Sequence, residues 1–164
     1  MNVDRLKLAI VSCGFLGCAP IAPGTFGTLG GVAIAWLLSG TGRMFPVWCL
    51  IACVALYALT APLGRWAESY AGKKDPGIFV MDEVIGYLIT ILWFDGPSYL
   101  ALVTAFFVFR FFDIVKPWPA RAMERIGGGH GILLDDVFAG IWALAAVMVP
   151  LRLIFSEAPW VAGT

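Results

Sequence analysis

The chain has 164 residues, of which 60% are apolar and 13% charged, and eleven basic residues balance eleven acidic ones. A soluble domain usually carries about 25% charged residues. The composition therefore favours a chain that lies in a lipid bilayer, and the length favours a single membrane-embedded domain over residues 1–164. Nucleic acid is not an expected partner, because a chain without net charge has no overall positive field to attract it.

The N-terminal residues and the cysteines carry little functional signal. Arg5 and Lys7 precede an apolar run, as they would in a secretion signal, but glycine and serine residues interrupt that run. Residues 1–20 are therefore expected to belong to the mature chain. The four cysteines are interpreted as small apolar packing residues rather than as a disulfide or a metal site.

The apolar segments predict an all-α, polytopic membrane bundle with about four to five membrane segments. In chain order we expect helices over 29–38 (after a turn at Ala22–Thr28), Pro46–Leu63, Ile78–Phe94, Ser98–Val115 and Leu133–Phe155. The first is short or re-entrant, because a spanning helix needs about 20 residues. The connections are a polar loop Gly64–Gly77, a tight turn Asp95–Pro97, a short amphipathic stretch Ala120–Ile126 and a flexible glycine run Gly127–Gly131.

Basic residues predict the orientation of these segments. If all five cross, the N-terminus and the loops at 64–77 and 116–131 share one side, which then holds Arg5, Lys7, Arg65, Lys73, Lys74, Lys116, Arg121 and Arg125. The other side keeps Arg43 and Arg152. Because positive loops stay in the cytoplasm, the two large loops are placed inside. If the first segment only dips into the bilayer, the N-terminus alone changes sides.

This topology gathers the charged residues of the helices near the cytoplasmic surface. Asp82 and Glu83 open the third helix, Arg110, Asp113 and Lys116 form one stripe at the end of the fourth, and Asp135 and Asp136 open the fifth. Four carboxylates in a small volume need a countercharge, and oxygen ligands select a hard cation such as Mg²⁺. We therefore expect Asp82, Glu83, Asp135 and Asp136 to bind metal.

The remaining charges indicate a phosphate ester as substrate. Arg110 and Lys116 are then available for an anion, with Thr25 as a further candidate ligand for phosphate. Metal, carboxylates and cations are the parts that phosphoryl transfer requires. Asp113 is expected either to orient Arg110 or to complete the metal shell, and the nucleophile is either water or an aspartate.

Plainer interpretations exist for each residue taken singly. Acidic residues at helix starts act as caps and suit the helix dipole, and charged residues at helix ends often lie in the headgroup layer. Thr25 is a common type of helix cap, the glycine run is a common type of linker, and His130 is a lone histidine in it. The whole set at one face of a membrane chain favours function instead, because intramembrane charges are costly.

Four sequence blocks resemble the phosphatidylglycerophosphatase A family of bacterial membranes. They are APGTFGTLGG at 22–31, DPGIFVMDEVIGYLIT at 75–90, FRFFDIVKPWPAR at 109–121 and GGGHGILLDDVFAG at 127–140. The resemblance implies an Mg²⁺-dependent hydrolase of the cytoplasmic (inner) membrane that converts phosphatidylglycerophosphate to phosphatidylglycerol and phosphate. The matching polar positions are Asp75, Asp82, Glu83, Arg110, Asp113, Lys116, Asp135 and Asp136. His130 departs from the apolar residue expected in its turn.

Two other classes remain open from the sequence. A membrane transferase acting on another phospholipid headgroup also uses aspartates and Mg²⁺, but the Asp-Gly-x-x-Ala-Arg run typical of such enzymes is not found after Asp95-Gly96. An ion or proton transporter would use intramembrane acids nearer to the middle of the bilayer.

Overall fold

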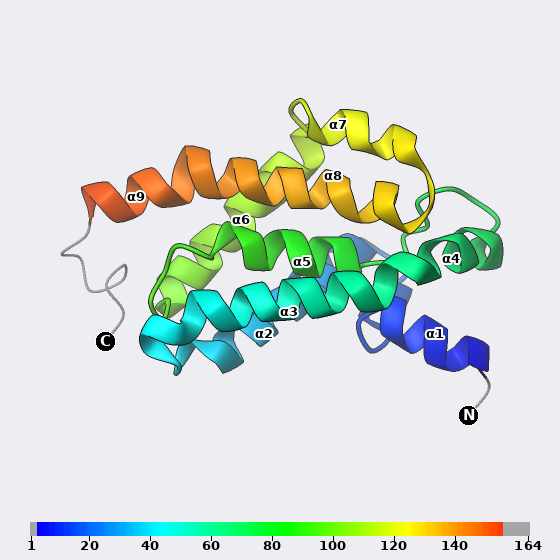
Figure 1. Ribbon diagram of the computed structural model, residues 1–164, viewed down its shortest axis with the longest axis horizontal. Coiled ribbons are helices and arrows are strands. Elements are labelled where there is room, and N and C mark those ends of the chain that lie inside the picture. The colour runs from blue at the N-terminus through cyan, green and yellow to red at the C-terminus, as the bar shows by residue number, and fades with distance from the viewer. Residues whose placement is uncertain (1–2, 156–164) are drawn as a thin grey trace.

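The computed structural model describes residues 3–155 and is entirely helical over that range (Figure 1). The α-helices are α1 (Val3–Val11), α2 (Pro23–Ser39), α3 (Phe45–Thr60), α4 (Gly64–Ala71), α5 (Met81–Thr90), α6 (Tyr99–Val115), α7 (Ala120–Met123), α8 (Gly128–Ala143) and α9 (Val149–Ile154). Short 3₁₀ turns are η1 (Leu16–Cys18), η2 (Gly42–Met44), η3 (Ala61–Leu63) and η4 (Glu124–Ile126), and η5 (Leu144–Met148) is a π-helical segment. The predicted all-α class is confirmed.

Two continuous helices are long and apolar enough to cross a membrane. One runs over Gly42–Ala71 through α3 and α4, and the other runs over Gly128–Ile154 through α8 and α9. The predicted count of four to five spans is not supported. Helices α2 and α6 have 17 residues each and α5 has 10, which are fewer than the roughly 20 residues that a spanning helix needs.

Helix α5 is the central element of the bundle. It contacts α2, α3, α6 and α8, and eight of its ten residues are buried (Figure 1). Its backbone approaches α8 closely, because a β-carbon added at Gly140 would lie 2.4 Å from the carbonyl oxygen of Gly86. Small residues at such crossings let helices pack backbone against backbone. The middle of α5 is thereby held beside the second half of α8. Asp135 and Asp136, which were predicted to open this helix, lie at its middle.

The bundle has two ends of different character. The N-terminal helix, α4 and α7 lie at one end, while the α2–α3 connection, the α5–α6 connection and α9 lie at the other (Figure 1). The segments at the first end carry the eight basic residues that the sequence assigned to one side, whereas Arg43 and Arg152 belong to elements at the opposite end. There Arg152 pairs with Asp95 at 2.6 Å. The arrangement agrees with the predicted grouping of the basic segments.

Several helix boundaries follow the prediction and others do not. The second helix is confirmed as α3 with η3, the fourth as α6 with Ser98 as its N-cap, and the short amphipathic stretch as α7 with η4. The predicted Ile78–Phe94 helix is shorter, at Met81–Thr90. The described N-terminal residues also form α1, which the sequence did not predict.

Three segments predicted as turns or loops are helical. Pro23–Thr28 is the start of α2, since a proline in the first turn needs no N–H partner. The first half of the predicted Gly64–Gly77 loop is α4, whose Ala67 is buried. The glycine run begins α8, and it allows close contact: a β-carbon at Gly129 would lie 2.0 Å from the carbonyl oxygen of Ala61. Gly129 therefore serves close packing, whereas Gly127 and Gly128 adopt positive φ angles at the start of the helix.

Candidate active site

The site begins with the acidic pair at the start of α5. Asp82 and Glu83 occupy the first turn of the helix, where the dipole favours negative charge. Asp82 is only 7% exposed. The central position of α5 places this pair inside the bundle, so the carboxyl groups must either be protonated or have their charge balanced by a protein cation or a bound ion.

A third carboxylate comes from α8. One oxygen from each of Asp82, Glu83 and Asp136 lies within 4.8 Å of the others, and Asp136 is 2% exposed. We call these residues the carboxylate trio. Within the described chain, Oδ1 of Asp82 and Oε2 of Glu83 are buried and accept no hydrogen bond. A buried, unsatisfied carboxylate oxygen is costly, so the trio has the character of a cation site.

The electrostatics of α5 support the same interpretation. This helix lies outside the two helices long enough to span a membrane. Burial raises the pKa of Asp82 well above its usual range, and the neighbouring carboxylates of Glu83 and Asp136 add to the rise. Burial likewise raises the pKa of Glu83. A bound cation would reverse both effects by stabilising the charged carboxylates.

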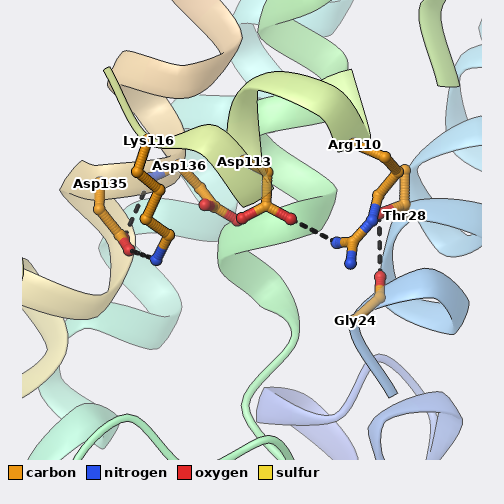
Figure 2. A network of polar contacts seen from close by, with 7 residues as sticks. All are labelled: Gly24, Thr28, Arg110, Asp113, Lys116, Asp135 and Asp136. Atoms are coloured by element: carbon orange, nitrogen blue, oxygen red, sulfur yellow. Dashed lines mark hydrogen bonds and ion pairs between the residues drawn. The ribbon is translucent and has the colours of Figure 1, made fainter. Parts of the chain in front are cut away.

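Helix α6 places an ion pair beside the trio. Nη1 of Arg110 lies 2.5 Å from Oδ2 of Asp113, one helical turn further along. Figure 2 shows Asp113 between Arg110 and Asp136, so its carboxylate touches both the cation and a member of the trio. The predicted role of Asp113 as a residue that orients Arg110 fits this geometry. Its contact with Asp136 also places it next to the carboxylate trio, so the alternative role as a metal ligand stays open.

Lys116 and Asp135 form a second ion pair at the other side of the trio. Nζ of Lys116 donates to Oδ2 of Asp135 at 2.6 Å, and Oδ1 of Asp135 accepts from the backbone N–H of Asp136 at 3.0 Å (Figure 2). Lys116 ends α6 in the left-handed conformation, with φ of 46°. The structure therefore brings three of the four predicted metal ligands together, whereas the fourth, Asp135, forms an ion pair with Lys116.

The start of α2 closes the site near Arg110. A β-carbon added at Gly24 would lie 2.3 Å from Oε1 of Glu83 and 3.2 Å from Nη1 of Arg110. Thr28 donates to the carbonyl oxygen of Gly24 at 2.9 Å (Figure 2). Sequence reasoning named Thr25 in this segment and missed Gly24. The available signal was a glycine directly after the proline that opens the helix, where a side chain would block close approach.

His130 lies apart from the trio. Its Nδ1 is hydrogen-bonded to the hydroxyl of Tyr57 at 2.8 Å, and both side chains are near the surface. A separate cavity of about 260 Å³ is lined by Asp75 and Asp135, together with Lys74, Glu68 and the glycine turn before α8. Asp75 thus faces the Asp135 side of the site rather than the trio.

The comparison with known proteins agrees with this arrangement. A family model described as phosphatidylglycerophosphatase A matches residues 9–151, which contain every residue of the site. This chain belongs to the phosphatidylglycerophosphatase A family. The resemblance inferred from the four sequence blocks is therefore confirmed, and the chain is a phosphoric monoester hydrolase.

Individual relatives cover most of the chain. A phosphatidylglycerophosphatase A from Escherichia coli is 33% identical over 84% of this chain and 82% of its own length. One from Haemophilus influenzae is 37% identical over 77% of each chain. A Bacteroides thetaiotaomicron protein with the provisional description phosphatidylinositol-3-phosphatase is 36% identical over 94% of each. No solved structure matches this chain.

Proposed function

We propose that the protein hydrolyses the terminal phosphate of phosphatidylglycerophosphate, with Mg²⁺, at the cytoplasmic face of the bacterial inner membrane. The family supports the phosphatase activity and a phospholipid substrate. The observation that carries the metal dependence is the carboxylate trio, whose buried oxygens at Asp82 and Glu83 have no hydrogen-bond donor in the described chain.

The trio fits a hard divalent cation. All of its donors are carboxylate oxygens, which is the ligand set that Mg²⁺ prefers. Asp82, Glu83 and Asp136 would hold the ion, and Asp113 is close enough to Asp136 to assist. When bound, Mg²⁺ supplies Lewis-acid polarisation of a phosphoryl oxygen and neutralises developing charge. Asp135 would contribute to catalysis by positioning Lys116 rather than by binding the metal.

The two cations of α6 are proposed to bind the phosphate. A guanidinium has five N–H donors and an ammonium has three, so Arg110 and Lys116 can each bind an anion while keeping their carboxylate partners. Asp113 and Asp135 fix the direction of these donors before substrate arrives. Preorganised donors are effective in phosphoryl transfer because the protein mainly positions groups and neutralises charge. Either water or an aspartate of the site remains the candidate nucleophile.

Membrane embedding and orientation are part of the proposal. The two long apolar helices support insertion, and the basic segments at the end that holds the site support a cytoplasmic location for that end. The substrate headgroup would then reach the trio from the membrane surface, with its acyl chains in the bilayer.

The substrate is tested with a panel of lipid phosphates. Phosphate release from phosphatidylglycerophosphate, phosphatidylinositol 3-phosphate and phosphatidic acid is measured in neutral detergent micelles, with Mg²⁺ and with chelator. We expect the fastest Mg²⁺-dependent release from phosphatidylglycerophosphate. Preference for the inositol lipid would assign the activity suggested by the Bacteroides relative instead. Headgroup exchange without phosphate release would indicate the transferase, and proton flux in vesicles would indicate the transporter.

A further inference from the structure

A cavity with three cationic side chains lies beside the site, between the end of α6 and α7. Its volume is about 450 Å³, and its described lining includes Lys116, Arg121 and Arg125 together with Val115 and Trp118. None of the lining side chains that the structure describes is acidic. Three cations around one cavity favour an anionic ligand, because the carboxylate of Asp135, which pairs with Lys116, does not balance all three charges.

The two arginines are placed as a pair. Arg121 and Arg125 are four residues apart on the helical turns of α7 and η4, so they lie on the same face, and both are exposed. Arginine suits phosphate groups, since its planar fork donates two parallel hydrogen bonds to their oxygens. The cavity is therefore open to a ligand that approaches from outside the bundle.

Lys116 connects this cavity to the carboxylate trio. Its side chain lines the cavity, and its ammonium is bonded to Asp135, the residue directly before Asp136 of the trio. The left-handed backbone of Lys116, uncommon for a residue with a side chain, keeps it at this junction. An anion in the cavity and a phosphate at the trio would thus be neighbours with one cation between them.

We propose that this cavity binds the phosphodiester of the substrate lipid while the terminal phosphate lies at the trio. The inference rests on the proposed function and deepens it. Phosphatidylglycerophosphate carries a phosphodiester and a phosphomonoester on one glycerol, so a site for it needs adjacent places for both anions. Trp118 is 79% exposed and its carbonyl accepts from Trp142 of α8 at 3.0 Å. An exposed, anchored tryptophan suits the membrane interface, where the diester of a bilayer lipid is located.

The test compares two double variants with the same loss of charge. Arg121→Ala/Arg125→Ala removes two cations of the cavity, while Arg5→Ala/Lys73→Ala removes two exposed cations from the same end of the bundle. Each protein is assayed in neutral detergent micelles for kcat and KM with phosphatidylglycerophosphate. Inhibition constants are measured for phosphatidylglycerol, which has only the diester, and for inorganic phosphate, which resembles only the monoester.

We expect the arginine variant to raise KM and the phosphatidylglycerol inhibition constant by about tenfold or more, since both arginines lose their charge-assisted hydrogen bonds to the diester. The kcat and the phosphate inhibition constant should change less than about threefold, and the control variant should change little in any value. Equal effects in both variants would show general attraction to an anionic surface and overturn the proposal, as would an unchanged phosphatidylglycerol constant.

Calorimetric titration of phosphatidylglycerol into the protein makes the same comparison without turnover. Weaker binding by the arginine variant alone supports the cavity, and equal binding by all three proteins overturns it. A wild-type protein that binds phosphatidylglycerol but releases no phosphate would contradict the proposed function separately. Circular dichroism checks that both variants keep their helical content.

Discussion

The two acidic pairs of the chain have the same local sequence but different surroundings. Asp82-Glu83 in α5 and Asp135-Asp136 in α8 are each followed by valine, and a small residue lies one turn after the first acid of each pair. Both acids of the α5 pair join the carboxylate trio, whereas only the second acid of the α8 pair does. The first, Asp135, is bound by Lys116.

The difference shows that a neighbouring helix decides the role of each acid. Helix α6 ends beside the middle of α8, where Lys116 donates to Asp135. Among the residues that the structure describes, no cation pairs with Asp82, so burial among carboxylates dominates there. The four acids therefore divide into three proposed metal ligands and one residue that positions a cation.

The largest expected effect distinguishes the two acids of α8. Asp136→Asn and Asp82→Asn should each lower kcat by about a hundredfold to a thousandfold, because removal of one charge-stabilising group at a reacting centre costs about this much. Asp135→Asn should lower it by about tenfold. Steady-state phosphate release measures all three, with circular dichroism as the folding control. Full activity of either of the first two variants would remove that residue from the site.

The Lys116–Asp135 pair can be tested by a double-mutant cycle. Lys116→Met leaves a carboxylate that is 4% exposed without its cation, and this should destabilise the protein by about 3–5 kcal/mol. Adding Asp135→Asn should restore most of the stability without restoring activity. Thermal unfolding in detergent and phosphate release give the two readouts. Additive losses of stability would mean that the two side chains do not act as a pair.

The close approach of α2 to the α5 pair predicts a smaller effect. Gly24→Ala forces its β-carbon against Glu83 and Arg110, so kcat/KM should fall by about tenfold as those groups shift. Gly40→Ala is the matched control, since a β-carbon there meets nothing within 4 Å and its φ is −67°. Equal activity of both variants would place the start of α2 outside the site.

The raised pKa of Asp82 predicts how pH acts on the metal-free protein. A carboxyl whose pKa is raised on folding binds protons more tightly in the folded state, so its contribution to stability is lost as pH rises through the folded pKa. Mg²⁺ binds the charged form, so the increase in Tm on adding Mg²⁺ should grow with pH. Unfolding scans with chelator or Mg²⁺ at several pH values measure this. An increase that stays constant with pH would argue against binding at the α5 pair.

The sequence predicted which charged residues lie near one another better than it predicted which of them form pairs. Helical spacing predicted that Arg110 and Asp113 point the same way, and the structure pairs them. The predicted alternation of the segments agrees with the gathering of Asp82, Glu83 and Asp136. Spacing along one helix does not show which acid of a neighbouring helix faces a given cation. The division between Asp135 and Asp136 therefore required the three-dimensional arrangement.

The errors in the fold have a related cause. The glycines of 128–131 and 23–28 read as turns because glycine weakens isolated helices. In the bundle they let backbones approach, as at Gly129 against Ala61 and Gly24 against Glu83, and packing outweighs propensity. Gly24 was missed because a search for polar side chains does not identify a glycine whose backbone lies close to the site.

The most direct test of the carboxylate trio is the affinity for a divalent cation. Mn²⁺, used as a paramagnetic substitute for Mg²⁺, can be titrated into the detergent-solubilised protein and followed by electron paramagnetic resonance. We expect Asp82→Asn and Asp136→Asn to weaken binding by about tenfold to a hundredfold, as loss of a charged ligand contact costs about 1.5–3 kcal/mol. Asp135→Asn should weaken it by less than about threefold. An equal loss in Asp135→Asn and Asp136→Asn would contradict the division of the acids described here.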